Sequence, residues 1–111
     1  MDRVSYNDFE KLDLRVGEIK EVENHPNADK LFVLKVDFGD DELKTIVAGL
    51  RKYYSTDDLI GKKAIFVYNL EPVVLRGVES NGMILAASDS GKERVKILIV
   101  DGDIETGSRI S

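Results

Sequence analysis

The sequence predicts a small all-β barrel of five strands, and three observations indicate this fold class. Residues 30–38 alternate large apolar side chains with mostly polar ones, which is the period of a half-buried strand. Residues 63–69 form a nearly all-apolar strand, and residues 83–88 together with 94–100 have the pattern of a hairpin. Residues 49–61 carry a helical signal between the third and fourth strands. This order of elements is typical of an OB-fold, a small Greek-key barrel.

The N-terminal residues predict a short helix followed by the first strand. Residues 6–12 have the pattern of one helical turn, with Ser5 or Asn7 available as its cap. We expect this turn to pack over the barrel as a lid. Residues 14–22 are strand-like, but the parity of their apolar positions shifts after Gly17. A bulge or a barrel corner is therefore expected at that glycine.

Two turns frame the clearest strand. Residues 23–29 contain Pro26 together with asparagine and aspartate, which are common turn residues. Residues 39–42 follow the strand at 30–38 and predict a hairpin turn into a third strand at 43–48.

The second half of the chain contains the inserted helix, one long connection and a C-terminal extension. Ser55 or Thr56 can cap the helix, and acidic residues follow in its first turn, where the helix dipole favours them. Residues 69–83 contain one proline and two glycines and indicate a loop. Residues 101–111 are too few to form a unit of their own.

Length and composition indicate one soluble domain spanning residues 1–111. The sequence is 42% hydrophobic and 33% charged, which is ordinary for a globular protein. No apolar run approaches the roughly 20 residues of a membrane span, and no signal peptide is visible. The sequence has no cysteine, so it can form no disulfide, and the cytoplasm is the expected compartment.

The net charge of −5 is unlike that of a general nucleic-acid binder, but the charge is unevenly distributed. Residues 1–43 hold six Lys/Arg against twelve Asp/Glu, residues 44–96 hold nine against six, and residues 97–111 hold one against three. A basic middle between acidic ends allows phosphate contact on one side, or it is simply a set of scattered solubilising charges. The basic middle includes Lys44, Arg51, Lys52, Lys62, Lys63 and Arg76.

The sequence lacks the residues that catalysis, a metal site or a cofactor would need. His25 is the only histidine, so a zinc ion would depend on carboxylates around one imidazole, which is an uncommon ligand set. No nucleophile elbow accompanies the serines, and no glycine-rich phosphate loop is present. Acidic runs such as residues 40–42 are typical of solvent-facing turns. We therefore expect a binding protein without a cofactor.

Several fragments of the sequence resemble the signature of the tRNA-binding domain family, and they occur in the family's order. Together they extend over nearly the whole chain, and four fragments in order are far more specific than any one alone. The family includes modules of methionyl-tRNA synthetases, freestanding dimeric tRNA-binding proteins and a secretion chaperone. The fragments are Asp13-Leu14-Arg15-Val16-Gly17, His25-Pro26-x-Ala28-Asp29-Lys30-Leu31, Ile46-Val47-x-Gly49-Leu50, and Asn69-Leu70-x-Pro72 with Arg76-Gly77-Val78-x-Ser80-x-Gly82-Met83 and Leu85-Ala86-Ala87-Ser88.

The resemblance implies an OB-fold that binds tRNA by its shape, as a homodimer and with a methionyl-tRNA synthetase catalytic chain as a possible partner. Arg76 is expected to clamp a phosphate or stack on a base, and Met83 to offer an apolar contact unless it belongs to the core. Ser80 is expected to contact RNA or only to cap a turn. The alternatives are a protein-binding chaperone and a pure dimerisation module. The full set of expected tRNA contacts is Arg76, Ser80, Asn69, Met83, Asn81, Lys30 and Arg51.

The sequence also departs from the family pattern within this loop. Glu71 occupies a position where relatives often have lysine, and Val73 and Val74 replace residues that are commonly basic. Because each neutralised phosphate contributes close to one unit of logarithmic salt slope, these replacements predict weak binding of tRNA.

Overall fold

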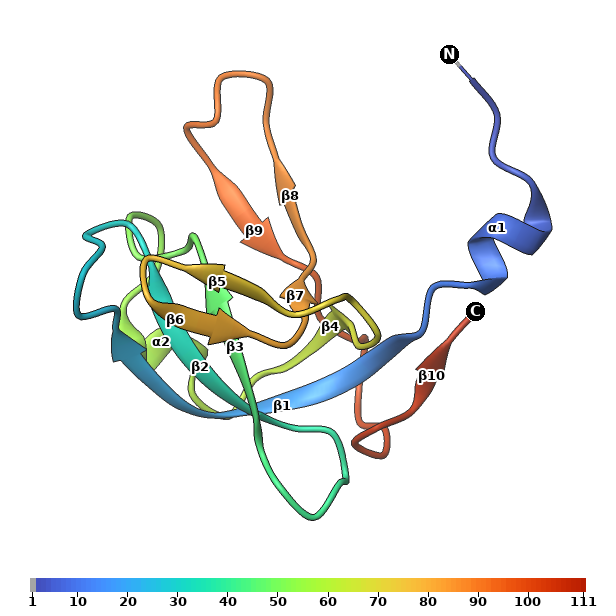
Figure 1. Cartoon of the computed structure of the whole chain (residues 1–111), viewed down its shortest axis with the longest axis horizontal. Helices are drawn as coiled ribbons and strands as arrows, with labels where there is room; N and C mark the ends of the chain where they lie inside the picture. Colours follow the sequence, from blue (N-terminus) through green and yellow to red (C-terminus); the bar gives the residue numbers. More distant parts are fainter. Residues whose placement is uncertain (1) are drawn as a thin grey trace.

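The structure, a computed structural model, describes residues 2–111 and consists mainly of antiparallel strands. Five of the strands form a sheet in the order β3-β2-β1-β4-β7, which curls into a nearly closed barrel (Figure 1). A helix lies between β3 and β4 in the chain. The predicted five-stranded barrel of the OB-fold type is therefore confirmed. Within residues 2–111, no helix is both long and apolar enough to cross a membrane.

The long strand β1 (Leu14–Asn24) is shared by both sides of the barrel. Its first half pairs with β4 and its second half pairs with β2. The ladder with β2 is interrupted between Ile19 and Glu21, so the bulge expected at Gly17 lies nearer the middle of the strand. Bulges add twist to a strand, and this one lies where β1 passes from one neighbour to the other.

Gly17 has a packing role rather than the predicted bulge. A Cβ atom at this position would lie 2.6 Å from Val36 Cγ1 and 2.7 Å from Phe38 Cε1. Both distances are far below van der Waals contact, so only glycine lets the core side chains lie directly against the β1 backbone.

The segment from β2 to α2 agrees with its local sequence signals. β2 (Phe32–Asp37) and β3 (Lys44–Ala48) form the predicted hairpin, and β2 alternates buried and partly buried residues along its length. α2 (Thr56–Leu59) is capped by Ser55, whose side chain accepts the amide of Asp58, while the Asp58 carboxylate accepts the amide of Ser55. This reciprocal cap satisfies two backbone donors that the helix itself cannot satisfy.

The barrel is closed by a short strand and a few hydrogen bonds. β4 (Lys63–Val67) pairs with β7 (Met83–Ile84) on the side away from β1. From there the sheet reaches β3 through the amide of Asn81, which donates to the carbonyl of Thr45 at 2.9 Å.

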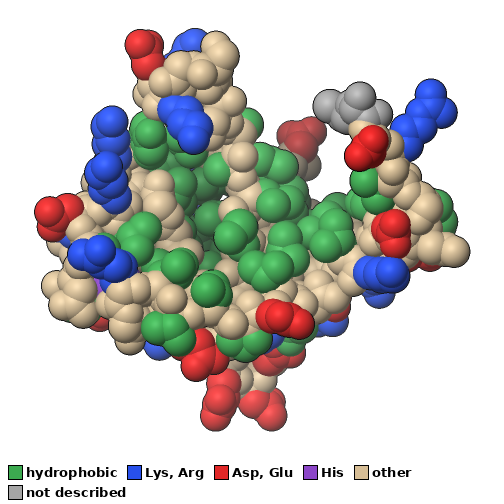
Figure 2. Space-filling view, turned by 45° about the horizontal axis from the view of Figure 1, so that its top comes forward, with side chains coloured by type: hydrophobic (Ala, Val, Ile, Leu, Met, Phe, Trp, Pro, Cys, Tyr) green, Lys and Arg blue, Asp and Glu red, His purple; other side chains and the backbone are tan. Residues whose placement is uncertain are grey.

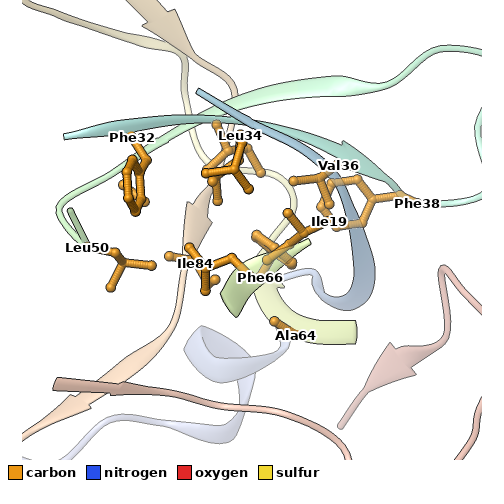
Figure 3. Close-up of a cluster of buried hydrophobic side chains, with 13 residues drawn as sticks. Ile19, Phe32, Leu34, Val36, Phe38, Leu50, Ala64, Phe66 and Ile84 are labelled. Atoms are coloured by element: carbon orange, nitrogen blue, oxygen red, sulfur yellow. The ribbon is translucent and has the colours of Figure 1, made fainter. Parts of the chain in front are cut away.

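The core fills the barrel with aliphatic and aromatic side chains from all five strands and from α2 (Figure 3). Phe38 and Phe66 meet edge to face at its centre, with ring centroids 5.3 Å apart. Leu59 of α2 is fully buried in the same cluster. The cluster consists of Ile19, Val22, Phe32, Leu34, Val36, Phe38, Ile46, Ala48, Leu50, Leu59, Ala64, Phe66 and Ile84.

Two hairpins lie outside the five-stranded sheet: β8–β9 stands clear of the barrel, whereas β5–β6 runs across it (Figure 1). β5 (Val73–Leu75) and β6 (Val78–Ser80) form the first hairpin, so the loop predicted at residues 69–83 is in fact largely a hairpin. β8 (Ala86–Ser88) and β9 (Val95–Ile97) form the second, as the sequence predicts.

The strand expected at residues 83–88 is divided in two. Its start, β7, belongs to the barrel, whereas β8 pairs only with β9. Leu85 lies between them, and its amide donates to the carbonyl of Ile65 while its carbonyl accepts the amide of Leu98. The chain therefore changes pairing partner at Leu85.

The N-terminal helix does not form the predicted lid. α1 (Tyr6–Glu10) has the predicted Ser5 cap, but none of its residues is buried. It lies on an arm that stands away from the barrel, near the C-terminal strand β10 (Arg109–Ile110) (Figure 1). The amphipathic pattern of residues 6–12 correctly predicts a helix, but this barrel offers it no surface. β10 extends the sheet by pairing with the start of β1.

Candidate nucleic-acid interface

The β5–β6 hairpin separates residues that the sequence places in one loop. Its turn is formed by Arg76 and Gly77, both with positive φ, at 53° and 91°. Two such residues in a two-residue turn match the twist of the flanking strands, although asparagine is the usual first residue. Each strand has three residues, so the tip lies roughly 10 Å from the base at 3.3 Å per residue. Arg76 is therefore at the opposite end of the hairpin from Asn69 and Asn81.

The tip of the hairpin is joined to the loop between β1 and β2. Arg76 Nη2 donates to the carbonyl of Asn27 at 3.3 Å, and Asn27 Nδ2 donates to the carbonyl of Arg76 at the same distance. These reciprocal bonds keep the guanidinium beside the loop. They also bring together two family fragments that are about fifty residues apart, since the bonds span 49 positions.

His25 adds a buried connection between the same two segments. It is 3% exposed, its Nε2 lies 2.9 Å from the carbonyl of Leu75, and its Nδ1 accepts the amide of Asn27 at 3.0 Å. The neutral ring with hydrogen on Nε2 satisfies both bonds. The sequence places His25 only within the predicted turn at residues 23–29. In the structure this side chain also holds the strand that leads directly into Arg76.

Three of the predicted contact residues gather at this junction, and we refer to Lys30, Arg51 and Arg76 as the cationic cluster. The amide of Arg51 donates to the carbonyl of Lys30, and its guanidinium donates to the carbonyl of Ala28, both at 3.4 Å. Lys30 and Arg76 also line a shallow cavity of about 280 Å³ with Ala28 and Asp29. Three cations around one loop form a surface suited to phosphate groups.

Asn69 is engaged elsewhere. Its side-chain oxygen accepts the amide of Asp13 at 2.9 Å, and its side-chain nitrogen donates to the carbonyl of Lys11 at 2.8 Å. Both hydrogen bonds hold the segment between α1 and β1 against the end of β4. The structure thus gives this amide an architectural role, away from the cationic cluster.

Ser80 is inside the protein. It is 1% exposed, and its hydroxyl accepts the amide of Val47 at 2.9 Å and donates to the carbonyl of Gly82 at 3.0 Å. The hydroxyl replaces a missing backbone bond between β3 and the β6–β7 connection. It has no exposed surface with which to contact RNA, so the alternative reading of Ser80 as a turn-capping residue fits the structure better.

Asn81 and Met83 have different surroundings again. Asn81 lines a hollow beside Asp40, Asp41 and Glu42, where the acidic residues disfavour a phosphate. Met83 is 47% exposed and is therefore not a core residue. It lines a groove of about 380 Å³ that adjoins the cationic cluster.

Two members of the basic middle, Lys44 and Lys63, have partners outside the cluster. The Lys44 ammonium lies 3.7 Å from the centroid of the Tyr68 ring, and the Arg15 guanidinium lies 3.9 Å from it. Lys63 donates to the Asp103 carboxylate at 3.2 Å. Lys44 and Lys63 are therefore engaged in structural contacts away from the cationic cluster.

The charged groups around Tyr68 shift the pKa values of two side chains, Asp13 and Tyr68. Hydrogen bonds from the Arg15 guanidinium lower the pKa of Asp13, and the hydrogen bond to the Asp40 carboxylate raises the pKa of Tyr68. A lowered carboxyl pKa stabilises the folded state at pH values above the carboxyl's usual pKa, and this stabilisation is lost as the pH falls through the lowered value.

Within residues 2–111 no group of three or more acidic or histidine side chains could hold a metal ion.

Comparison with known proteins gives consistent matches. The family model described as "Putative tRNA binding domain" matches residues 14–109. A methionine–tRNA ligase of Thermococcus kodakarensis is 54% identical over 110 residues, which is 99% of this chain but 14% of that enzyme. The chain thus spans about one seventh of the length of the curated relative.

Two solved structures are similar over almost their whole length. The MetRS-related protein from Pyrococcus horikoshii has a TM-score of 0.92 and 36% identity, and the match covers 100% of both chains. The CsaA chaperone protein from Picrophilus torridus has a TM-score of 0.87 and 40% identity, covering 98% of this chain and 100% of that one.

Proposed function

The chain belongs to the tRNA-binding domain family, and from this membership we propose that it is a noncatalytic module that binds tRNA by shape. We propose further that it acts in the cytoplasm with a methionyl-tRNA synthetase, either as part of the synthetase or as a separate cofactor. Methionine–tRNA ligases are among its relatives, and a module of this kind raises the effective concentration of tRNA near a catalytic chain.

The observation that carries the proposal is the convergence of Lys30, Arg51 and Arg76 on the loop between β1 and β2. In an OB-fold this loop and the connection between the last two barrel strands flank the face that binds oligonucleotides. Both segments are present here, and His25 and Asn27 join them. We assign tRNA contact to these three cations and to Met83, and not to the structural side chains of Asn69 and Ser80.

Glu71, which stands where relatives often have lysine, weakens phosphate binding at the cationic cluster less than the sequence suggests. Glu71 precedes β5 at the base of the hairpin, whereas Arg76 is at its tip. Five residues of extended chain span roughly 16 Å, which is about twice the Debye length at physiological salt. The Glu71 carboxylate is therefore largely screened from phosphates bound at the tip.

Single neutralisation of Arg76 tests the function. Arg76→Ala should lower the affinity for total tRNA about tenfold at ~100 mM salt, because one phosphate contact is lost. Lys20→Ala serves as the matched control, since Lys20 pairs with Glu18 on β1 outside the cluster. The measurement is a titration of labelled tRNA followed by fluorescence anisotropy. Equal losses in the two variants, or no binding by the native protein at ~20 mM salt, would contradict the proposal.

We propose in addition that the chain is a homodimer, and the N-terminal arm, residues 2–12, supports this. The arm presents Val4, Tyr6 and Phe9 with 74%, 71% and 39% of their surface exposed. Its helix has five residues, fewer than an isolated helix needs for stability in water. A second copy of the chain would cover these apolar side chains and stabilise the helix.

Removal of residues 2–10, which leaves the Lys11 carbonyl in place for Asn69, tests the dimer. The native protein should have the mass of a dimer in light scattering, and the shortened protein that of a monomer at the same concentration. The barrel should keep its thermal transition, because no α1 side chain belongs to its core. A native monomer, or a shortened protein that remains dimeric, would overturn the proposed role of the arm.

A further inference from the structure

An apolar groove lies directly beside the cationic cluster. It is lined by Leu31 and by residues of β3 and the segment after it, of β7 and of the β5–β6 and β8–β9 hairpins, and its volume is about 380 Å³. Figure 2 shows hydrophobic side chains covering the hollow below the β8–β9 hairpin, with Lys and Arg side chains along its left and upper margins. The apolar and aromatic residues that line it include Leu31, Leu50, Tyr53, Leu75 and Met83.

Resting on the function proposed above, we propose that this groove receives a single unpaired nucleobase of the bound RNA. Proteins that recognise RNA bases take them unstacked, and they hold them against aromatic and apolar side chains. The groove supplies such side chains in Tyr53 and Met83, and Ser88 and Lys92 are among the residues that line it.

The connection between groove and cluster is built into the sequence. Each of the three cations is adjacent along the chain to a residue that lines the groove: Lys30 to Leu31, Arg51 to Leu50, and Arg76 to Leu75. A phosphate bound at the cluster therefore has the groove within the span of one nucleotide. This juxtaposition favours a nucleotide, which is anionic at one end and apolar and aromatic on its base faces, over an uncharged apolar peptide.

Tyr53 is held in place at the groove. Its hydroxyl donates to the carbonyl of Lys92 at 3.0 Å, which ties the segment after β3 to the turn of the β8–β9 hairpin. The Lys52 ammonium lies 5.9 Å from the centroid of the same ring. A tyrosine that is fixed at its hydroxyl end loses little conformational freedom when a base stacks on it.

A pair of RNA duplexes tests the inference. One is blunt and fully paired, and the other carries a single bulged 2-aminopurine, a fluorescent adenine analogue. The native protein should bind the bulged duplex about tenfold more tightly, which is typical of one stacked base, and should quench the analogue's emission. Met83→Ala and Tyr53→Ala should remove this preference, whereas Tyr53→Phe should retain the stacking and the quenching.

Ile60→Ala is the matched control, because Ile60 is 48% exposed against 47% for Met83 and lies after α2, outside the groove. Arg76→Ala should weaken binding of both duplexes equally, since it removes a phosphate contact. Thermal transitions of all variants confirm that they are folded.

The outcomes separate the two proposals. Binding of both duplexes with equal affinity would overturn the base site and leave the tRNA-binding function standing. No binding of either duplex or of tRNA at ~20 mM salt would overturn both. Binding of an unfolded apolar peptide that is lost in Met83→Ala, with RNA binding unchanged in that variant, would assign the groove to a protein ligand and overturn the inference.

Discussion

A triple glutamine variant of Lys30, Arg51 and Arg76 should bind total tRNA about two to three orders of magnitude more weakly than the native protein at ~100 mM salt. Each phosphate contact contributes about 0.9 to the slope of the logarithm of affinity against the logarithm of salt concentration. Over the decade from 1 M down to ~0.1 M salt, three contacts therefore raise the affinity by a factor close to one thousand, and a variant without them lacks this gain. Glutamine keeps a side-chain donor for the carbonyl of Ala28, which the Arg51 guanidinium reaches at 3.4 Å. The loop between β1 and β2 should therefore keep its shape.

The control removes three positive charges elsewhere. Lys11, Lys20 and Lys62 are lysines outside the cluster, and their triple glutamine variant has the same net charge as the test variant. It should bind within a few-fold of the native protein. If both variants lose affinity equally, tRNA is attracted by the overall field of the protein and the cluster is not a site.

Gly17→Val should be the most destabilising of the single substitutions considered, because it places a branched side chain against Val36 and Phe38. Even a Cβ atom would lie 2.6 Å from Val36 Cγ1 and 3.0 Å from Phe66 Cδ1. Overpacking of this kind costs about 3 kcal/mol, which lowers the melting temperature of a domain this size by about 15 °C. Thermal unfolding followed by circular dichroism measures the change.

Gly91→Val is the comparison for this substitution. Gly91 lies in the turn of the β8–β9 hairpin, where the nearest atom to a Cβ is the Glu93 Cγ at 3.6 Å. Its variant should melt within a few degrees of the native protein. A Gly17→Val protein that melts equally close to the native one would show that β1 is not packed against Phe38 and Phe66 as the structure has it.

Local signals predict most of the barrel. The alternation from Phe32 to Phe38 identifies β2 because one face of a strand buries every second residue. Ser55 or Thr56 followed by acidic residues predicts the start of α2, and the cap that forms, between Ser55 and Asp58, lies within one turn. The β8–β9 hairpin is equally local, with its turn between two short apolar runs.

Contacts between segments that are far apart in the sequence cannot be predicted from such local signals. Ser80 is buried because β3, 33 residues earlier in the chain, has an amide that needs an acceptor there. The Asn69 side chain forms hydrogen bonds with the backbone of Lys11 and Asp13, more than fifty residues away. A polar side chain in a glycine-rich stretch therefore looks equally suited to a ligand or to the protein's own backbone.

The hairpin between residues 69 and 83 is missed for a different reason. Its strands have only three residues each, and its turn uses Arg76 where a sequence-based reading looks for asparagine or aspartate before glycine. The consequence for the site is large, because a loop would gather Asn69, Arg76 and Asn81, whereas a hairpin separates them. The β5–β6 hairpin also places Arg76 near Lys30 and Arg51. The sequence groups these three residues only by charge and family resemblance.

The central claim is that phosphate groups of tRNA bind at the cationic cluster, and the salt dependence of affinity tests it most directly. The logarithm of the association constant should be measured against the logarithm of salt concentration for the native protein and for the triple glutamine variant of Lys30, Arg51 and Arg76. We expect the slope of the variant to be shallower by about two to three units. Equal slopes for the two proteins would contradict the claim and place the tRNA contacts elsewhere on the barrel.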